Sequence, residues 1–114
     1  MPPKKLSALI KKMVRLVTSV DDVEKMILFG SYAKGNPTLD SDLDMAIILS
    51  RFSFNAFEEK LENKVRISTA IRPIKDVVEV DLKLYARDEW ETATKTQNWF
   101  SREILKTGVT VYAK

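Results

Sequence analysis

The sequence predicts an α/β (α+β) fold in which helices pack on a small mixed β-sheet. Short apolar runs of strand length alternate along the chain with longer segments of helical periodicity. The chain has 114 residues, the size of one domain, and 45% of them are hydrophobic, which is enough for a modest core. We therefore expect a single domain over residues 1–114, without internal repeats or a linker.

The composition limits the chemistry that this chain can perform. Cysteine and histidine are both absent, which excludes disulfides, thiolate or imidazole zinc sites, a cysteine nucleophile and a histidine base. Catalysis would therefore use carboxylates, hydroxyls, amines and a hard metal ion. The net charge of +3 suits an anionic substrate or partner. No apolar run reaches the roughly 18 residues of a membrane span, and no signal peptide is visible, so we expect a soluble cytoplasmic protein.

The first half of the chain predicts a helix and two strands. Apolar residues recur at helical spacing over residues 4–20, with lysines on the other face, which indicates an amphipathic helix covering a sheet. The first strand is expected at Val23–Phe29, where a continuous apolar run is typical of a strand covered on both faces. The second strand is expected at Asp42–Ser50.

The middle of the chain predicts a longer helix. We expect it to begin after a cap at Ser53 or Asn55 and to run to about Ile71, where Arg72-Pro73 stops it. Its apolar residues at spacings of three and four predict the buried face, which consists of Phe57, Leu61, Val65, Ile67 or Ser68, and Ile71.

The last third predicts a strand, two helices and a terminal extension. Val77–Tyr85 alternates between apolar and polar residues, as a half-buried strand does. A short helix would follow with Asp88 as its N-cap, and a last helix would run from about Thr96 to Lys106, with Gly108 as its C′ residue. Residues 109–112 form a short extension that could be an edge strand. The residues available for packing on the last helix are Trp99, Phe100, Ile104 and Leu105.

The stretch GSYAKGNPTLDSDLD, residues 30–44, carries the clearest sign of chemistry. Ten residues separate Ser31 from an Asp-x-Asp formed by Asp42 and Asp44. Alternate residues of a strand face the same side, so these carboxylates would point together and repel unless a divalent cation such as Mg²⁺ binds them. Gly30 permits a sharp turn, and a helix beginning at Ser31 would offer N–H groups to phosphate. An acidic hairpin loop is the structural alternative, but the combination favours a site for a nucleoside triphosphate and its metal ions.

Asp81 is the candidate for a third carboxylate. It interrupts a strand rich in valine and leucine. If this strand pairs with the second, Asp81 can face Asp42 and Asp44, and the three would surround one or two metal ions. An attacking hydroxyl could then lose its proton to Asp81. Glu79, on the same face, is the rival for this role, and a solvated or salt-bridged Asp81 is the structural alternative.

The Gly-Ser pair, the Asp-x-Asp and the later Asp resemble the pattern of the DNA polymerase β-like nucleotidyltransferase superfamily. The chain's size and its ending, Ile104–Tyr112, resemble the minimal nucleotidyltransferase (MNT) branch. The resemblance covers about Val23 to Tyr112 and implies the polymerase β-like nucleotidyltransferase fold. The roles that it implies are triphosphate contacts for Gly30 and Ser31, metal ligation for Asp42 and Asp44, and a third ligand or base at Asp81.

The resemblance also implies ATP as substrate, two Mg²⁺ ions as cofactors and a partner protein. Many MNT proteins are antitoxins that transfer AMP to a tyrosine of a HEPN-domain toxin, so it implies a Mg-dependent protein adenylyltransferase. Relatives that modify small molecules carry an additional acceptor-binding domain, for which this chain has no room. The family often has arginine in the first turn after Gly-Ser. Here Lys34 would offer a point charge to phosphate, or it is a solvated loop lysine.

Two other functions follow from the same residues. A non-catalytic nucleotide-binding module would neutralise its partner by occlusion, with the carboxylates as a relic. Extension of nucleic-acid ends ranks last, because the charge excess is small and no basic, aromatic-rich groove is visible.

Overall fold

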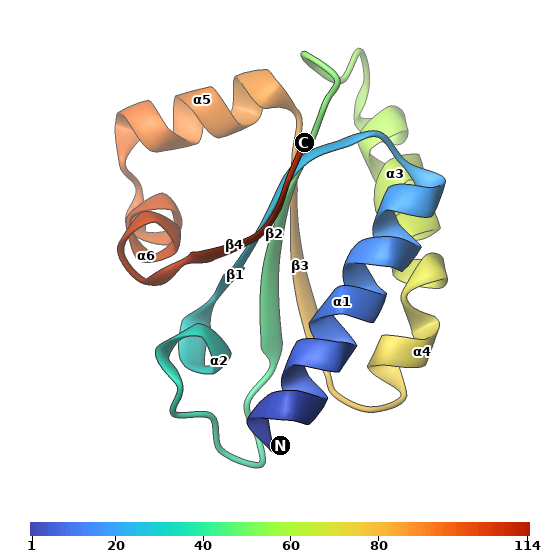
Figure 1. Cartoon of the computed structure of the whole chain (residues 1–114). Helices are drawn as coiled ribbons and strands as arrows, with labels where there is room; N and C mark the ends of the chain where they lie inside the picture. The colour runs from blue at the N-terminus through green and yellow to red at the C-terminus, as the bar shows by residue number, and fades with distance from the viewer.

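The computed structural model, shown in Figure 1, describes residues 1–114 as one mixed sheet with six helices around it. The strands are β1 (Val23–Phe29), β2 (Leu43–Leu49), β3 (Val80–Tyr85) and β4 (Val109–Ala113). Their order in the sheet is β3-β2-β1-β4. β1 is antiparallel to both β2 and β4, whereas β2 and β3 are parallel. The mixed sheet expected from the sequence is confirmed, and the terminal extension is an edge strand.

Helices cover both faces of the sheet (Figure 1). Their bounds are α1 (Pro3–Val20), α2 (Gly30–Lys34), α3 (Phe57–Ala70), α4 (Arg72–Lys75), α5 (Arg87–Thr96) and α6 (Trp99–Thr107). α1, α3 and α4 lie on one side, and α5 and α6 lie on the other. No helix of the chain combines the length and the apolar character that a bilayer crossing requires.

The sheet therefore separates two apolar cores. On β1, Met26 and Leu28 enter the larger core, which α1, α3 and α4 complete, while Ile27 and Phe29 enter a smaller core with Ile104 of α6. Alternate residues of a strand point to opposite faces, so an uninterrupted apolar run fits a strand that is covered on both sides. The predicted bounds and the two-sided burial of β1 are confirmed.

The buried face predicted for α3 is wrong in part. Phe57 is 73% exposed, and Leu61 and Val65 are exposed as well, whereas Ile67 is fully buried as expected. Asn63, a polar residue, is buried instead. The helix is rotated relative to its apolar spacing, because its inward face carries an amide that the structure satisfies with hydrogen bonds.

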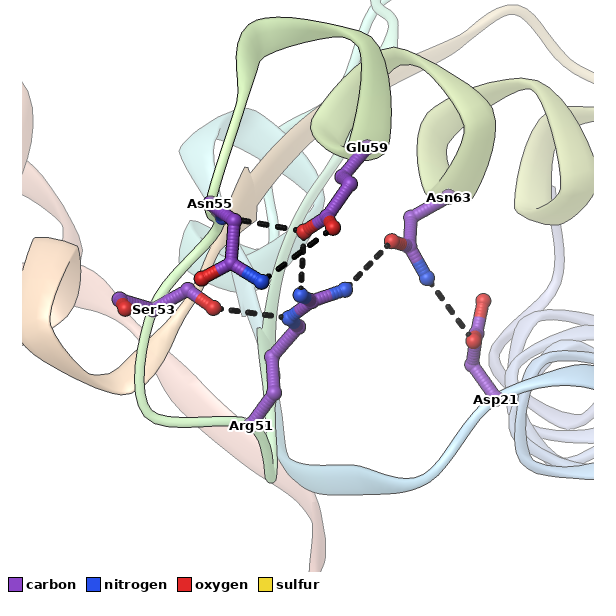
Figure 2. A network of polar contacts seen from close by, with 6 residues as sticks. All are labelled: Asp21, Arg51, Ser53, Asn55, Glu59 and Asn63. Carbon is purple, nitrogen blue, oxygen red and sulfur yellow. Dashed lines mark hydrogen bonds and ion pairs between the residues drawn. The ribbon is translucent and has the colours of Figure 1, made fainter.

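Figure 2 shows the network that holds Asn63 in place. Its Nδ2 donates to Asp21 Oδ1 at 2.9 Å, and its Oδ1 accepts from Arg51 at 3.3 Å. Arg51 also donates to Glu59 Oε2 at 2.6 Å. The backbone N–H of Asn55 donates to the same carboxylate at 3.0 Å. The network joins the end of α1, the loop after β2 and the first turns of α3, so it sets the rotation of that helix.

Two predicted helix caps are also wrong. α3 has Ala56 as its N-cap and no side-chain cap, since Asn55 interacts with Glu59 instead of capping. α5 begins after Ala86, whose N–H donates to Glu89 Oε1 at 3.0 Å, so Asp88 lies inside the first turn. In both helices a glutamate inside the first turn accepts from a backbone N–H of the entering chain, which replaces the expected cap.

The last helix begins later than predicted and ends differently. Asn98 caps α6 by accepting from the N–H of Ser101 at 2.9 Å. Gly108 follows α6 with φ −68°, so it is not in the left-handed conformation expected of a C′ glycine. Glycine is required at this position for space, because a Cβ there would overlap the Ile104 carbonyl oxygen and the Ile27 side chain. Of the four predicted packing residues only Ile104 is buried, while Trp99, Phe100 and Leu105 are exposed.

Candidate active site

The segments that carry the Gly-Ser turn and the predicted aspartates, namely α2 and the starts of β2 and β3, lie at one end of the sheet (Figure 1). β1 ends there, and the parallel strands β2 and β3 both begin there. In the register of the sheet, Phe29 is opposite Asp44, and Asp44 is beside Asp81. Neighbouring strands lie about 4.8 Å apart, so the pairing places these two carboxylates next to each other on one face. The predicted pairing of the second and third strands is confirmed.

Gly30 closes this arrangement from the β1 side. Its backbone φ is +74°, a value that residues other than glycine rarely adopt. A Cβ at this position would also overlap Asp44 Oδ2. Ser31, which follows in α2, is partly exposed. The chain therefore turns sharply against the Asp44 carboxylate, and glycine is required there for two independent reasons.

The electrostatics of Asp44 reflect this crowding. Burial raises the pKa of its carboxyl group from 3.8 to about 6, and the negative charges of Asp81 and then Asp42 contribute further. The positive charge of Lys83 opposes the shift. A carboxylate that is both desolvated and close to other carboxylates is unfavourable without a cation, which is the usual environment of a metal ligand or a catalytic acid.

Asp42 and Asp81 are placed less tightly than Asp44. Asp42 is exposed and precedes β2 instead of opening it, which corrects the predicted start of that strand. Asp81 lies on the edge strand, half-exposed, with Lys83 Nζ 3.6 Å from its Oδ1. No three acidic side chains of the chain gather closely enough to hold a metal ion by themselves.

The donor set nevertheless fits a hard cation. Mg²⁺ prefers oxygen ligands, and it is commonly held by one or two carboxylates together with substrate phosphates and waters instead of a closed protein cage. Asp44 and Asp81, side by side, offer such a pair, and Asp42 stands at its rim. The ligands that the chain does not supply would come from a nucleotide.

Two other sequence candidates lie elsewhere. Lys34 Nζ pairs with Glu103 Oε1 of α6 at 2.9 Å, so the structure directs this lysine to α6 and not to the aspartates. Glu79 is exposed and precedes β3, where its backbone oxygen accepts from the N–H of Leu43 at 2.7 Å. Its charge is not among those that shift the pKa of Asp44, which favours Asp81 over Glu79 as the third carboxylate.

The structure adds Phe100 as a neighbour of the site, a residue to which the sequence assigned only packing. Lys83 Nζ, beside Asp81, lies 4.7 Å from the centre of the Phe100 ring in α6. The packing of α6 against α2 and β1 brings Phe100 to Lys83, the neighbour of Asp81. The exposure of Phe100 would have identified it as a candidate for the site, but an apolar spacing pattern does not reveal that exposure.

Two open hollows lie near this end of the sheet, and one of them includes a site carboxylate. One, of about 540 Å³, is lined by Asp81 and by Leu61 and Val65 of α3. The other, of about 700 Å³, lies between Tyr32, the loop before β2 and the segment before β3. Both are open to solvent, and Asp81 is the one site aspartate that lines either of them.

The family described as "Polymerase beta, Nucleotidyltransferase" matches residues 11–114. The chain belongs to this family. The match includes the Gly-Ser turn and all three aspartates, and it confirms the superfamily that the sequence pattern resembles. No curated protein sequence matches the chain significantly.

Several solved structures share the fold of this chain. A putative nucleotidyltransferase from Sulfolobus solfataricus superposes with a TM-score of 0.63 and 20% identity, covering 96% of this chain and 82% of that one. A toxin–antitoxin with AMP-PNP gives 0.57 and 18%, covering 92% and 73%. The toxin–antitoxin MntA–HpeT, in a mutant with two aspartates changed to glutamate, gives 0.60 and 15%, covering 92% and 73%. At these identities the likeness establishes the fold, as predicted.

Proposed function

We propose that this nucleotidyltransferase-family chain transfers AMP from ATP to a hydroxyl group of a partner protein, a tyrosine in the first instance. The observation that carries the proposal is the pairing of Asp44 with Asp81 directly against the Gly30 turn. The partner would be a HEPN-domain toxin, and the chain its antitoxin. The toxin–antitoxin complexes among the similar structures support this, and one of them contains an ATP analogue.

The substrates would occupy the end of the sheet where the carboxylates meet. The triphosphate would lie against the turn at Gly30 and Ser31, and Asp42, Asp44 and Asp81 would hold Mg²⁺. When bound, the metal neutralises the negative charge that develops on the α-phosphate during transfer. Because the chain itself supplies an incomplete ligand set, nucleotide and metal would bind together.

The transfer itself is a substitution at the α-phosphorus. The acceptor oxygen forms the new P–O bond, the bond between the α-phosphorus and the oxygen bridging to the β-phosphate breaks, and pyrophosphate leaves. The hydroxyl proton passes to a carboxylate. Asp81 is the candidate base because it lies on the edge strand, half-exposed, where an acceptor can approach it.

Label transfer from α-³²P-ATP in the presence of Mg²⁺ tests the proposal. The acceptor would be the protein encoded by the neighbouring gene, and the enzymes would be the wild type, the double variant Asp42→Ala/Asp44→Ala, and Asp76→Ala as a control. Asp76 is exposed, directly follows α4 and is not among the charges that shift the pKa of Asp44. We expect label on the partner with the wild type and the control, and none with the double variant, which should still bind the partner.

The occlusion hypothesis predicts a different result. If the wild type forms a stable complex that neutralises the partner without transferring label, and if the double variant neutralises it equally well, the chain acts by covering its partner. The transfer reaction would then be excluded.

A further inference from the structure

The start of α6 presents two aromatic side chains to solvent next to the candidate active site. Trp99 is 67% exposed and Phe100 is 45% exposed. Their ring centres are 5.2 Å apart in an edge-to-face arrangement. Aromatic side chains contribute most to stability when they are buried, so an exposed adjacent pair is unfavourable for the isolated fold. This aromatic pair is therefore a candidate surface for contact with a ligand.

The position of the pair is fixed by the rest of α6. Ser101 and Ile104, which form the inward side of the helix, are fully buried, and Asn98 caps the first turn. The ion pair between Glu103 and Lys34 ties the same helix to the turn that follows Gly30. The exposure of the aromatic pair is thus a feature of a well-packed helix that is attached to the nucleotide side of the site.

Lys83 connects the aromatic pair to the carboxylates. Its Nζ lies over the Phe100 ring at 4.7 Å and 3.6 Å from Asp81 Oδ1. The ion pair contributes little because it is long and partly exposed. A cation–π contact at a site that is open to solvent is also weak. A triphosphate at the Gly30 turn would offer this ammonium group a stronger, charge-assisted partner. Lys83 would then leave the Phe100 ring face that it covers.

We infer that Phe100, with Trp99 beside it, is the stacking surface for the purine base of the bound nucleotide. This inference rests on the proposed nucleotide-binding function and adds the subsite that receives the base. A planar ring next to the phosphate-binding carboxylates is what a heterocyclic base requires, because every base has a π-face that stacks on an aromatic side chain. The phosphates and the base would then bind through separate groups, the carboxylate end and the aromatic pair.

Equilibrium titrations with two probes in the presence of Mg²⁺ test the inference. ATP contains the base, whereas inorganic tripolyphosphate contains only the phosphates. We expect Phe100→Ala to weaken ATP binding about tenfold, the magnitude of one lost base–aromatic stack, and to leave tripolyphosphate binding within about twofold of the wild type. Phe100→Tyr, which keeps a ring, should retain ATP binding. Phe52→Ala is the matched control, because Phe52 is also exposed but lies beyond the opposite end of the sheet.

Three results would overturn the inference. Unchanged ATP affinity in Phe100→Ala would exclude stacking on this ring. An equal loss for ATP and tripolyphosphate would show that Phe100 acts on the phosphate side through Lys83. In both cases the proposed function would stand, since the wild type binds its nucleotide. A wild-type chain that binds neither probe would instead contradict the proposed function together with the inference.

Discussion

The ionised carboxylate of Asp44 suits metal binding, but it lowers the stability of the metal-free fold. Its pKa is raised to about 6, first by burial and then by Asp81 and Asp42. Below about pH 4 the group is protonated in both the folded and the unfolded chain, so it has no effect on stability. Between about pH 4 and 6 only the folded chain retains the proton, so stability falls as the pH rises and stays lowered above that range.

The variant Asp44→Asn should remove this pH dependence. In metal-free buffer at pH 7.5 we expect its free energy of unfolding to exceed that of the wild type, and at pH 4 we expect the two to be similar. Urea unfolding in the presence of a chelator, at several pH values, measures the difference. Asp76→Asn serves as the exposed control. Parallel pH profiles for the wild type and Asp44→Asn would show that the carboxylate is not strained.

The sequence predicted some of these single-residue features and not others. The proximity of Gly30 and Asp44 follows from a local motif, because each residue stands at the end of a strand and the two strands are antiparallel neighbours. The pairing of Lys34 with Glu103 and the position of Phe100 near Lys83 depend on how α6 packs. No local pattern carries that information, so these contacts could only be found in the structure.

Among the elements, β1 and α3 differ in how well their patterns predict their burial. The continuous apolar run of β1 predicted that both faces of this strand are buried, and they are. In α3 the apolar residues at spacings of four favoured the face with Phe57, but Asn63 occupies the interior because Asp21 and Arg51 satisfy its amide. A buried polar residue with hydrogen-bond partners on other elements is invisible to a periodicity argument.

Two substitutions in α3 test its orientation. Ile67→Ala, at a fully buried position, should lower the free energy of unfolding by about 2–5 kcal/mol. Phe57→Ala should change it by only about 0.5 kcal/mol, because the side chain is mostly in solvent. Urea unfolding of both variants, with far-UV circular dichroism as the signal, compares them. Equal losses would mean that the helix is turned toward the face predicted from its apolar spacing.

For the molecule as a whole, a ligand that binds only the folded chain must stabilise it. With Mg²⁺ and a non-hydrolysable ATP analogue at about 100 times its dissociation constant, the stabilisation is about 2.7 kcal/mol, enough to raise the Tm by several degrees. We expect this rise in the wild type and in Asp76→Ala, and not in Asp42→Ala/Asp44→Ala. Calorimetry provides the measurement. A rise of the same size in the double variant would place the nucleotide elsewhere on the surface.

At this scale the sequence predicted the class of fold but not the order of its strands. Alternation of strands and helices indicated a mixed sheet, and that is confirmed. The placement of β4 beside β1 joins segments that are far apart in the chain. It depends on Gly108, because a side chain there would overlap Ile27 and the Ile104 carbonyl oxygen. Such a contact becomes visible only when the helices are already in position.

The edge position of β3 has a consequence for how tightly the site can bind its ligands. β3 is hydrogen-bonded to the sheet through β2 alone, yet it carries Asp81. A ligand shared by Asp81 and Asp44 would tie this strand to the interior, and any local opening of the strand would remove one of the ligand's contacts. By thermodynamic reciprocity, the binding energy of the ligand and the protection of the β3 amides from hydrogen exchange must rise and fall together. Hydrogen exchange of the β3 amides would therefore report whether a ligand occupies the site.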